Sequence, residues 1–501
     1  MLIVAALVAC SSPERETPRA AGHPGEPRGP GAGHPGPPGG PPGGPGGPPG
    51  SAPRTTPPEP ADPATFSAGG AGGPNILWVT TDTVSAGHLA PWGGRVPLPT
   101  LEGLGAVRVE QAYSNFPETA LSHWSMFTGV LPEVHGNVPP NGMSRYSGPS
   151  IAELAHARGY ATAAFIGGVT LKDESCGLSR GFDVYDDDLA AGADHRSAPE
   201  MVALAQRWIA TQKGPWFAWV HVFDAHLPYT PTDPSRFDKD YAGTLDGTEA
   251  KLRPFANGAS TPPERDLAHV TALYDAEIAE VDAALQPLFG SLHGDEIVVV
   301  NADHGESFAH NYLFNHRAVL WDDVLHVPLY VKAPGLKPGT VSGMVGLVDL
   351  LPTVVDLAGW HATAPFMGVS RVSVLRGEGG GATKLWARTD PWMPLLPGEA
   401  GARFAELTPT SRMIRELDGT RCTYDLGSDP GELHGDCAGG EDRAWTEYNA
   451  AIQAMSRYQR AEVSRPAGER LTPGEMLEQL GYTDRRPGSA PPPPPPPPAG
   501  R

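Results

Sequence analysis

Unbroken runs of apolar residues alternate with helical patterns through the middle of the chain. The runs occupy residues 75–81, 161–166, 216–223 and 296–301, and none of them alternates regularly between apolar and polar positions. Such runs are typical of strands covered on both faces, and hence of a largely parallel sheet. Residues 264–289 instead carry apolar side chains at helical spacing. The pattern predicts an α/β fold with a doubly wound, mostly parallel sheet flanked by helices.

Polar side chains follow three of these runs directly. Asp82 comes after the first run, Asp224 and His226 come after the third, and Asp303 and His304 come after the fourth. In doubly wound sheets, ligands bind at the carboxyl ends of the strands, so we expect these side chains at one edge. Carboxylates gathered there would repel one another unless a cation lay between them. The sequence therefore predicts a metal site.

Both ends of the chain have low complexity. Gly and Pro dominate the first 73 residues, and prolines fill residues 491–498. Such tracts bury too little apolar surface to offset the entropy of ordering, so we expect them to be disordered. The predicted division is a lipoprotein-type signal at 1–10, a Pro/Gly-rich linker at 11–73, a main domain at 74–375, a small α+β subdomain at 376–482 and a Pro-rich tail at 483–501.

The first residues, MLIVAALVACSS, form an apolar segment that ends at Cys10 and is too short to span a bilayer. The segment resembles a bacterial lipoprotein signal, in which Cys10 becomes lipidated, although no basic region precedes it. The resemblance implies a membrane anchor through Cys10 and a place in the bacterial cell envelope, facing the periplasm or the cell surface. The linker would then act as a spacer. The alternative is a chance apolar start with an inert cysteine.

The net charge restricts the class of binding partner, and the cysteines indicate a possible disulfide. The formal net charge of −20 argues against nucleic acid, because phosphate contacts need a basic face. It does not argue against a small anionic substrate, since a bound metal ion can invert the local field. In an oxidising compartment, we expect Cys422 and Cys437 to close a short loop, with Cys176 outside the disulfide.

Five motifs, in the same order along the chain, resemble the sulfatase family of the alkaline-phosphatase superfamily. They are PNILWVTTDT, SHWSMFTGVLPEVHG at 122–136, NADHGE at 301–306, LVDLLPTVVDLAGW at 347–360 and TYDLGSDPGE at 423–432. Several ordered matches are more specific than any one motif. The resemblance implies an alkaline-phosphatase-like fold and a hydrolase of sulfuric or phosphoric esters, with residues 74–375 as its catalytic domain.

The resemblance places the family's nucleophile at Thr119. In sulfatases this residue is a cysteine or serine that is converted to formylglycine, and threonine cannot become that aldehyde. The formylglycine hydrate has a second hydroxyl that expels sulfate, whereas a threonine sulfate ester has none. A threonine phosphate ester is relieved by in-line attack on phosphorus, so Thr119 favours phosphate mono- or diesters over sulfate. The alternative is that Thr119 only caps the helix that follows.

The resemblance also implies one divalent metal ion, held by Asp82, Thr119, Asp303 and His304. The second aspartate of the sulfatase first strand is replaced by Thr83. The remaining set resembles the branches that transfer phosphoethanolamine or phosphoglycerol to envelope acceptors. A histidine ligand and few carboxylates favour Zn²⁺ or Mn²⁺, with Ca²⁺ less suited.

Further histidines are candidates for catalysis. His226 and His316 fall where related enzymes contact substrate oxygens or protonate the leaving group, and His310 lies on the loop between them. His123 stands where sulfatases carry an arginine that orients the nucleophile. Each of these could instead be a hydrogen-bonded structural histidine. His221 lies within an apolar run, so we expect it to be buried and hydrogen-bonded.

The sequence is compatible with three functions. The first is a metal-dependent hydrolase acting on a small anionic ester or on an envelope glycan or lipid. The second is an envelope phosphoethanolamine or phosphoglycerol transferase that uses the same site, although such transferases usually carry several membrane spans. The third is a binding lipoprotein of the same fold without turnover, which a missing or weakly bound metal would favour.

Overall fold

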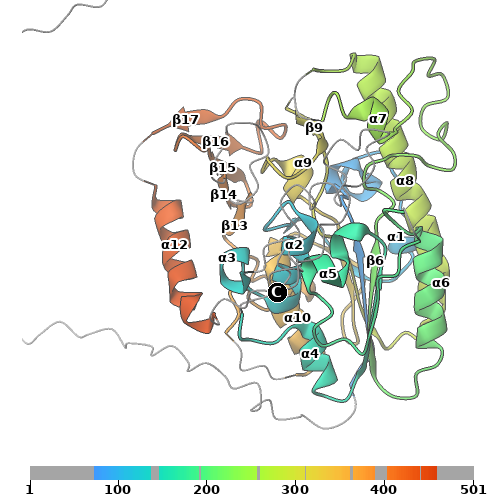
Figure 1. Ribbon diagram of the computed structural model, residues 1–501. Coiled ribbons are helices and arrows are strands. Elements are labelled where there is room, and N and C mark those ends of the chain that lie inside the picture. Colours follow the sequence, from blue (N-terminus) through green and yellow to red (C-terminus); the bar gives the residue numbers. More distant parts are fainter. Residues whose placement is uncertain are drawn as a thin grey trace, which may run out of the picture. The chain divides into compact units, whose positions relative to one another are not determined.

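The computed structural model describes residues 73–136, 146–190, 193–256, 260–310, 312–360, 365–389, 403–439 and 442–459 (Figure 1). The predicted signal at 1–10, the linker at 11–73 apart from Gly73, and the tail at 483–501 lie outside the described residues. Among the residues that are described, no helix has both the length and the apolar character needed to cross a bilayer.

The main sheet has eight strands, and the four predicted apolar runs form its centre. Its order is β11 (Gly339–Val341), β2 (Val107–Val109), β10 (Leu329–Lys332), β7 (Ile297–Ala302), β1 (Ile76–Thr81), β6 (Trp216–Val222), β4 (Ala161–Ile166) and β5 (Val184–Asp186). Strands β7, β1, β6, β4 and β5 run parallel, whereas β10 runs antiparallel to both of its neighbours. The predicted α/β class with a mostly parallel sheet is confirmed.

The register of the three central strands aligns the points at which they end. Thr81 of β1 pairs with Val222 of β6 on one side and with Ala302 of β7 on the other. All residues of these three strands are buried, as the unbroken apolar runs predict. Asp82 and Asp303 therefore leave the sheet side by side, at the same edge.

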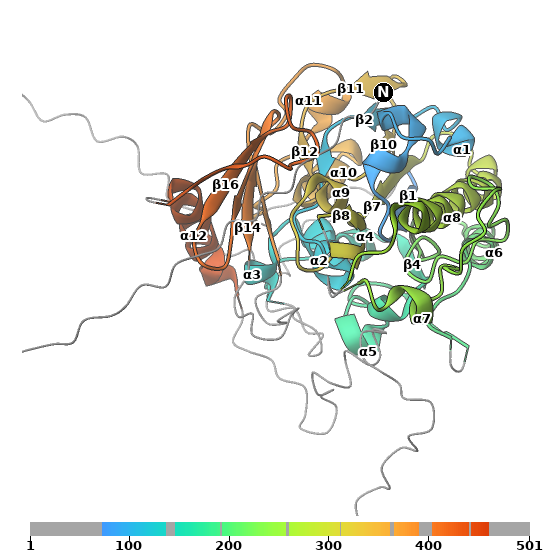
Figure 2. The same ribbon diagram turned by 90° about the horizontal axis from the view of Figure 1, so that it is seen from above.

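Helices cover both faces of the sheet (Figures 1 and 2). One group contains α6 (Ala198–Ile209) and the long α8 (Glu264–Gly290), which matches the helix predicted at 264–289. The other contains α2 (Thr119–Thr128), α4 (Ile151–His156) and α10 (Leu350–Leu357). Helix α2 is buried along its whole length, so its first residue is held firmly at the edge where β1 and β7 end.

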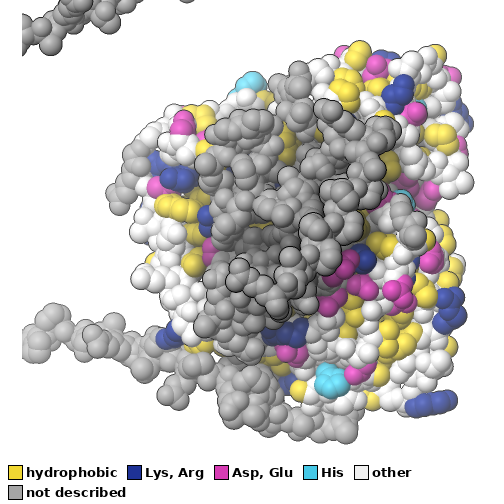
Figure 3. Space-filling model, in the orientation of Figure 1, with side chains coloured by type: hydrophobic (Ala, Val, Ile, Leu, Met, Phe, Trp, Pro, Cys, Tyr) yellow, Lys and Arg dark blue, Asp and Glu magenta, His cyan; other side chains and the backbone are white. Residues whose placement is uncertain are grey.

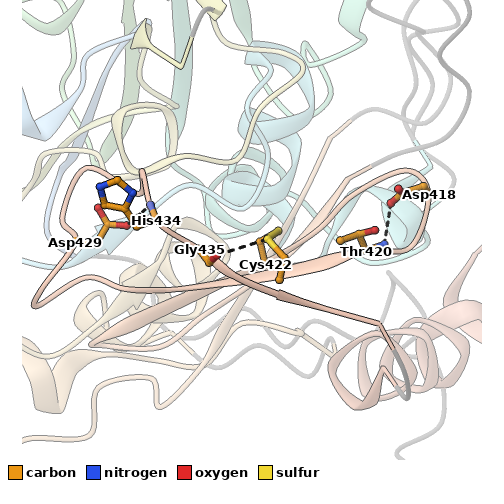
Figure 4. Close-up of a disulfide and its surroundings, with 7 residues drawn as sticks. Asp418, Thr420, Cys422, Asp429, His434 and Gly435 are labelled. Atoms are coloured by element: carbon orange, nitrogen blue, oxygen red, sulfur yellow. Dashed lines mark hydrogen bonds between the residues drawn. A yellow bond between two sulfur atoms is a disulfide. The ribbon is translucent and has the colours of Figure 1, made fainter. Parts of the chain in front are cut away.

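The C-terminal part is an antiparallel sheet with one helix. Its strands follow chain order as β13 (Leu385–Arg388), β14 (Phe404–Leu407), β15 (Ser411–Arg415), β16 (Arg421–Asp425) and β17 (Asp436–Ala438). Helix α12 (Arg443–Met455) packs Tyr448 against Phe404 of this sheet. The expected disulfide between Cys422 and Cys437 joins β16 to β17 (Figure 4). Cys176 is buried in the main core.

A buried ion-pair network connects the two parts. The side chain of Arg412 on β15 is 0% exposed and donates to Glu432 Oε1 at 2.9 Å and to Asp322 Oδ1 at 2.7 Å. Asp322 begins the short helix α9 (Asp322–Leu325) of the main domain. Arg403 donates to the carbonyl oxygen of Ala318 at 2.8 Å. The C-terminal sheet thus holds the segment that directly follows His316.

Replacing Arg412 by methionine is expected to lower the free energy of unfolding by about 3 kcal/mol, because it leaves the buried Glu432 carboxylate without its cation. Asp322 contributes less, since its side chain is 31% exposed and still contacts His326. Urea denaturation measures the change. Arg443→Met is the matched control, since Arg443 also pairs with a carboxylate but its side chain is 88% exposed. We expect little change there. Urea unfolding curves with the same midpoint and slope for Arg412→Met and Arg443→Met would contradict the prediction.

The described surface offers little concentrated positive charge on the face shown in Figure 3. Lys and Arg side chains there are scattered among Asp and Glu side chains. The chain as a whole carries 57 acidic and 37 basic residues. The described side chains visible on this face thus form no basic patch for an anionic partner.

Candidate active site

The structure brings the four predicted metal ligands together. Thr119 Oγ1 lies 3.3 Å from Asp82 Oδ2 and 3.4 Å from His304 Nε2. His304 Nε2 also lies 3.5 Å from Asp303 Oδ2 and 3.9 Å from Asp82 Oδ1. All four residues are buried, and Thr119 is 2% exposed.

The start of helix α2 explains why the Thr119 hydroxyl faces this group. Glu118 is the N-cap, and its carboxylate accepts from the backbone N–H of Leu121 at 3.1 Å. Thr119 is the first helical residue, so its hydroxyl has no capping task. One turn on, the Ser122 hydroxyl donates to the carbonyl oxygen of Asp303 at 2.8 Å. The alternative in which Thr119 only caps the helix does not match this arrangement.

The donor atoms fit a divalent cation. Asp82 Oδ1 and Asp303 Oδ2 are buried and accept no hydrogen bond from the described residues. One ligand atom each from Asp82, Asp303 and His304 lie within 4.8 Å of one another. Buried carboxylates without donors are unfavourable unless a positive charge is close. Two carboxylates, an imidazole and a hydroxyl form a set that suits Zn²⁺ or Mn²⁺.

The pKa values of these buried side chains also favour a bound cation. Burial raises the pKa of Asp82 to about 6. Burial, and then the charge of Asp82, raise the pKa of Asp303 to about 7. Burial lowers the pKa of His304. The ionised carboxylates that metal binding requires are thus disfavoured in the protein alone, and a bound cation would favour them.

His123 links helix α2 to the central strand. Its Nδ1 lies 2.7 Å from the carbonyl oxygen of Thr119, and its Nε2 lies 2.9 Å from Thr80 Oγ1. The Thr80 hydroxyl in turn accepts from Trp219 Nε1 at 2.9 Å. His123 therefore fixes the first turn of α2 on β1, which is the orienting place that the family resemblance gives it.

His221 differs from expectation. It is fully buried, as expected, but neither of its ring nitrogens has a hydrogen-bond partner within the described part of the chain, so the expectation of a hydrogen-bonded residue is wrong. Its Nε2 lies 3.3 Å from Asp82 Oδ2. The available signal in the sequence was its place near the end of the third apolar run, three residues before Asp224. The structure pairs His221 with Thr80, two residues before Asp82.

His226 and His316 lie beside the ligand group. His226 stacks on Phe223, and its Nδ1 donates to the carbonyl oxygen of Leu227 at 2.8 Å. Its Nε2 is buried and has no hydrogen-bond partner among the residues described. The ring of His316 lies 4.2 Å from that of His304 and 5.6 Å from that of His226, measured between centroids. His316 thus lies beside the ligand residue His304, and His226 lies beside His316.

Glu306 is a site residue that the sequence patterns did not single out. It is buried, and its Oε1 lies 3.1 Å from His316 Nδ1. Its Oε2 accepts from the Tyr229 hydroxyl at 2.8 Å. Its place directly after the Asp303-His304-Gly305 motif was the available signal.

Two other candidates lie elsewhere. His310 stacks on Trp321, which contacts Tyr424 of the C-terminal sheet, and the structure does not bring it to the Thr119 group. Asp224 accepts from the backbone N–H of Ala198, the first residue of α6, at 2.9 Å, so it binds the start of a helix and not His226.

A pH effect on stability arises near Asp224. Burial, and then the charges of Asp224 and Glu280, raise the pKa of Glu277 from 4.5 to about 8. Between these values the unfolded chain is ionised while the folded chain keeps the proton, so stability falls as the pH rises. Across that window we expect the wild type to lose up to about 4 kcal/mol more than Glu277→Gln. Urea denaturation at several pH values tests this.

Glu264→Gln is the control for that series, because Glu264 is an exposed residue on the same helix. It should keep the pH dependence of the wild type. Parallel stability curves for Glu277→Gln and the wild type between about pH 5 and about pH 8 would contradict the prediction.

Comparison with known proteins gives a consistent set of relatives. A family model described as Sulfatase matches residues 74–360. A delta 4,5-hexuronate-2-O-sulfatase of Bacteroides thetaiotaomicron is 30% identical over 167 residues, which cover 30% of this chain and 33% of the relative. Arylsulfatase K of Homo sapiens is 35% identical over 102 residues, 19% of each chain. The matches thus span a third or less of these relatives.

Solved structures share the fold at greater length. The phosphonate monoester hydrolase of Agrobacterium radiobacter aligns with a TM-score of 0.60 at 20% identity. The alignment covers 77% of this chain and 95% of that one. At this identity the likeness shows the fold, and it matches the architecture that the sequence predicts.

Proposed function

Because the chain belongs to the sulfatase family, we propose that it is a metal-dependent hydrolase of phosphate or sulfate esters with Thr119 as its nucleophile. One observation carries the proposal. Glu118 caps helix α2, so the Thr119 hydroxyl is not used for capping. This hydroxyl lies 3.3 Å from Asp82 Oδ2 and 3.4 Å from His304 Nε2. Esters of phosphate are favoured over those of sulfate.

The residues that would hold the metal ion are Asp82, Thr119, Asp303 and His304. Zn²⁺ or Mn²⁺ is favoured over Ca²⁺ because one ligand is an imidazole. When bound, the ion supplies positive charge that lowers the pKa of a ligand hydroxyl and offsets charge on the transferred group. The rest of the reaction depends on groups of the chain itself.

In the first step, a bond forms between Thr119 Oγ1 and phosphorus while the bond from phosphorus to the leaving oxygen breaks. Asp82, the nearest carboxylate, accepts the hydroxyl proton. In the second step, water attacks phosphorus, the Oγ1–P bond breaks and Thr119 regains a proton. His226 and His316 flank this position and exchange protons with the leaving oxygen and the attacking water.

The backbone at the start of α2 supports the same chemistry. Helix N-termini favour anions. The Glu118 carboxylate already accepts from the Leu121 N–H. The amides of Thr119 and Ala120 are therefore the ones offered to a substrate oxygen. His123 holds that turn on β1 through the carbonyl oxygen of Thr119. These contacts keep the nucleophile and the amides in a fixed relation before substrate arrives.

The choice of phosphorus over sulfur rests on the side chain at position 119. Threonine has one hydroxyl, so a sulfated Thr119 cannot expel sulfate as a formylglycine hydrate does. A phosphorylated Thr119 can be hydrolysed by in-line attack of water on phosphorus. Among the relatives, one is named for a hexuronate sulfate ester and another for phosphonate monoesters. Those names support an anionic ester as the substrate class.

An ester panel tests the proposal. The purified protein, supplied with Zn²⁺ or Mn²⁺, is assayed with an aryl phosphate monoester, an aryl phosphate diester and an aryl sulfate. We expect faster turnover of a phosphate ester than of the sulfate, and a covalent adduct on Thr119 by mass spectrometry. Adding an alcohol acceptor separates a hydrolase from a transferase, because a transferase would form the new ester instead of free phosphate. Absence of turnover with every ester, with metal bound, would favour a binding protein.

We also propose that the protein is anchored in the bacterial cell envelope through Cys10. The apolar segment that ends at Cys10 supports this place, and so does the disulfide between Cys422 and Cys437, since structural disulfides are typical of oxidising compartments. Cys10→Ser is expected to move the protein from the membrane fraction to the soluble fraction after cell lysis. An unchanged distribution would contradict the anchor.

A further inference from the structure

A second group of potential ligands lies against the first one. His123, His221 and Asp303 each offer one atom, and these atoms lie within 4.8 Å of one another. The three residues come from helix α2, strand β6 and the end of strand β7, and all are 0% exposed. Asp303 also belongs to the first group, with Asp82 and His304.

Two members of this second group have atoms without hydrogen bonds. Both ring nitrogens of His221 and the Oδ2 atom of Asp303 are buried and have no hydrogen-bond partner in the described ranges. Buried polar atoms are nearly always satisfied by protein, water or an ion, because leaving them bare costs free energy. His221 Nε2 lies 3.3 Å from Asp82 Oδ2 without a hydrogen bond. The His221 ring also offers a ligand atom within 4.8 Å of those of Asp303 and His123. One unsatisfied atom is common, but an imidazole with neither nitrogen hydrogen-bonded in a group that also holds an unsatisfied carboxylate oxygen indicates a bound species.

His123 must give up one contact to join such a site. Its Nδ1, 3.6 Å from Asp303 Oδ2, is also 2.7 Å from the carbonyl oxygen of Thr119. Thr119 lies in the first turn of α2, where that carbonyl also accepts a helical hydrogen bond, so losing the imidazole does not leave it bare. One hydrogen bond is small compared with a metal–ligand bond.

We propose that His123, His221 and Asp303 bind a second divalent cation, so that Asp303 is shared between two ions. Two imidazoles and a carboxylate form a ligand set that zinc favours and that calcium, which prefers oxygen ligands, does not. The second ion would tie β6 and the first turn of α2 to the end of β7. It would thereby replace the hold on that turn that His123 Nδ1 provides through the Thr119 carbonyl oxygen when no ion is bound there. The inference goes beyond the single ion of the proposed reaction and holds whether the substrate is a phosphate or a sulfate ester.

Metal content tests the number of ions. The full chain is loaded with Zn²⁺ and dialysed, and zinc per chain is measured by elemental analysis. We expect two ions in the wild type and one in His221→Gln, with His135→Gln as the control. His135 is also fully buried, lies on α3 (Pro132–His135) and should leave the content at two. Comparing variants with the wild type removes any contribution from histidines elsewhere in the chain.

Three outcomes would overturn the proposal. The first is one ion in the wild type, and the second is equal content in His221→Gln and the wild type. The third is loss of all zinc in His221→Gln, which would make His221 a ligand of the first ion. Thermal unfolding of each variant checks that it is folded.

A spectroscopic experiment tests whether the two ions share Asp303. With Mn²⁺ bound, two ions bridged by one carboxylate give an exchange-coupled paramagnetic resonance signal, whereas separate ions give the signal of isolated Mn²⁺. We expect coupling in the wild type and isolated Mn²⁺ in His221→Gln. Uncoupled signals from a wild type with two ions would overturn the shared site. Both readouts are independent of turnover, so a failed ester assay would leave them interpretable.

Discussion

Thr119→Ala is expected to lower kcat/KM for the preferred aryl phosphate ester by about 10⁴-fold or more, because the substitution removes the attacking oxygen. Thr119→Ser should retain turnover, since serine offers the same oxygen without the methyl group. The covalent adduct should form on the introduced serine in that variant and be absent from the alanine variant. Stopped turnover followed by mass spectrometry of the peptide that contains position 119 measures both.

Thr128→Ala is the matched control for this experiment. Thr128 ends the same helix, is also fully buried, and donates its hydroxyl hydrogen bond to the carbonyl oxygen of Trp124. Its loss should affect stability more than kcat. If the Thr119→Ala and Thr128→Ala variants kept equal turnover, the threonine nucleophile would have to be given up, and the family membership would still stand.

Removing the metal should abolish turnover. Asp82 Oδ1 and Asp303 Oδ2 have no hydrogen-bond donors among the described residues, so without a cation the two buried carboxylates repel one another. A chelator should reduce the rate by about 10³-fold or more, and added Zn²⁺ or Mn²⁺ should restore it better than Ca²⁺. Turnover before and after metal return, together with metal content, provides the measurement.

Asp303→Asn should reproduce the effect of the chelator, because the amide removes the charge that holds the ion. Asp356→Asn is the control, since Asp356 is an exposed aspartate on helix α10. Full activity of the chelated wild type would contradict a metal-dependent reaction. Full activity of Asp303→Asn alone would instead remove Asp303 from the essential ligands.

The sequence predicts the fold well because the central strands are buried on both faces. The run at residues 75–81 becomes β1 (Ile76–Thr81), and the run at 296–301 becomes β7 (Ile297–Ala302). In a chain whose strands and helices alternate, an unbroken apolar run of this length is best explained as a buried strand. The polar residues after these strands could be placed at one edge for the same reason, and the register puts Asp82 beside Asp303.

Side-chain contacts between distant segments were harder to predict. Sequence places His221 in a strand, but its lack of hydrogen bonds to described residues depends on where Asp82 and Asp303 point. The capping of α2 depends on one residue, Glu118, whose carboxylate turns back to Leu121 and leaves Thr119 for the site. His310 was a candidate only because of its place on the loop before His316, and it stacks on Trp321, which contacts Tyr424 of the C-terminal sheet.

The contacts of the C-terminal sheet with residues 318–322 have a consequence for how this architecture can be recombined. Arg403 and Arg412, which lie in the C-terminal part of the chain, contact Ala318 and Asp322 shortly after His316. A chimera that exchanged the C-terminal part would keep every ligand residue and the Glu306 contact of His316, but it would replace the side chains that hold Ala318 and Asp322. Moving residues 318–322 together with the C-terminal sheet would keep both of these contacts in the chimera.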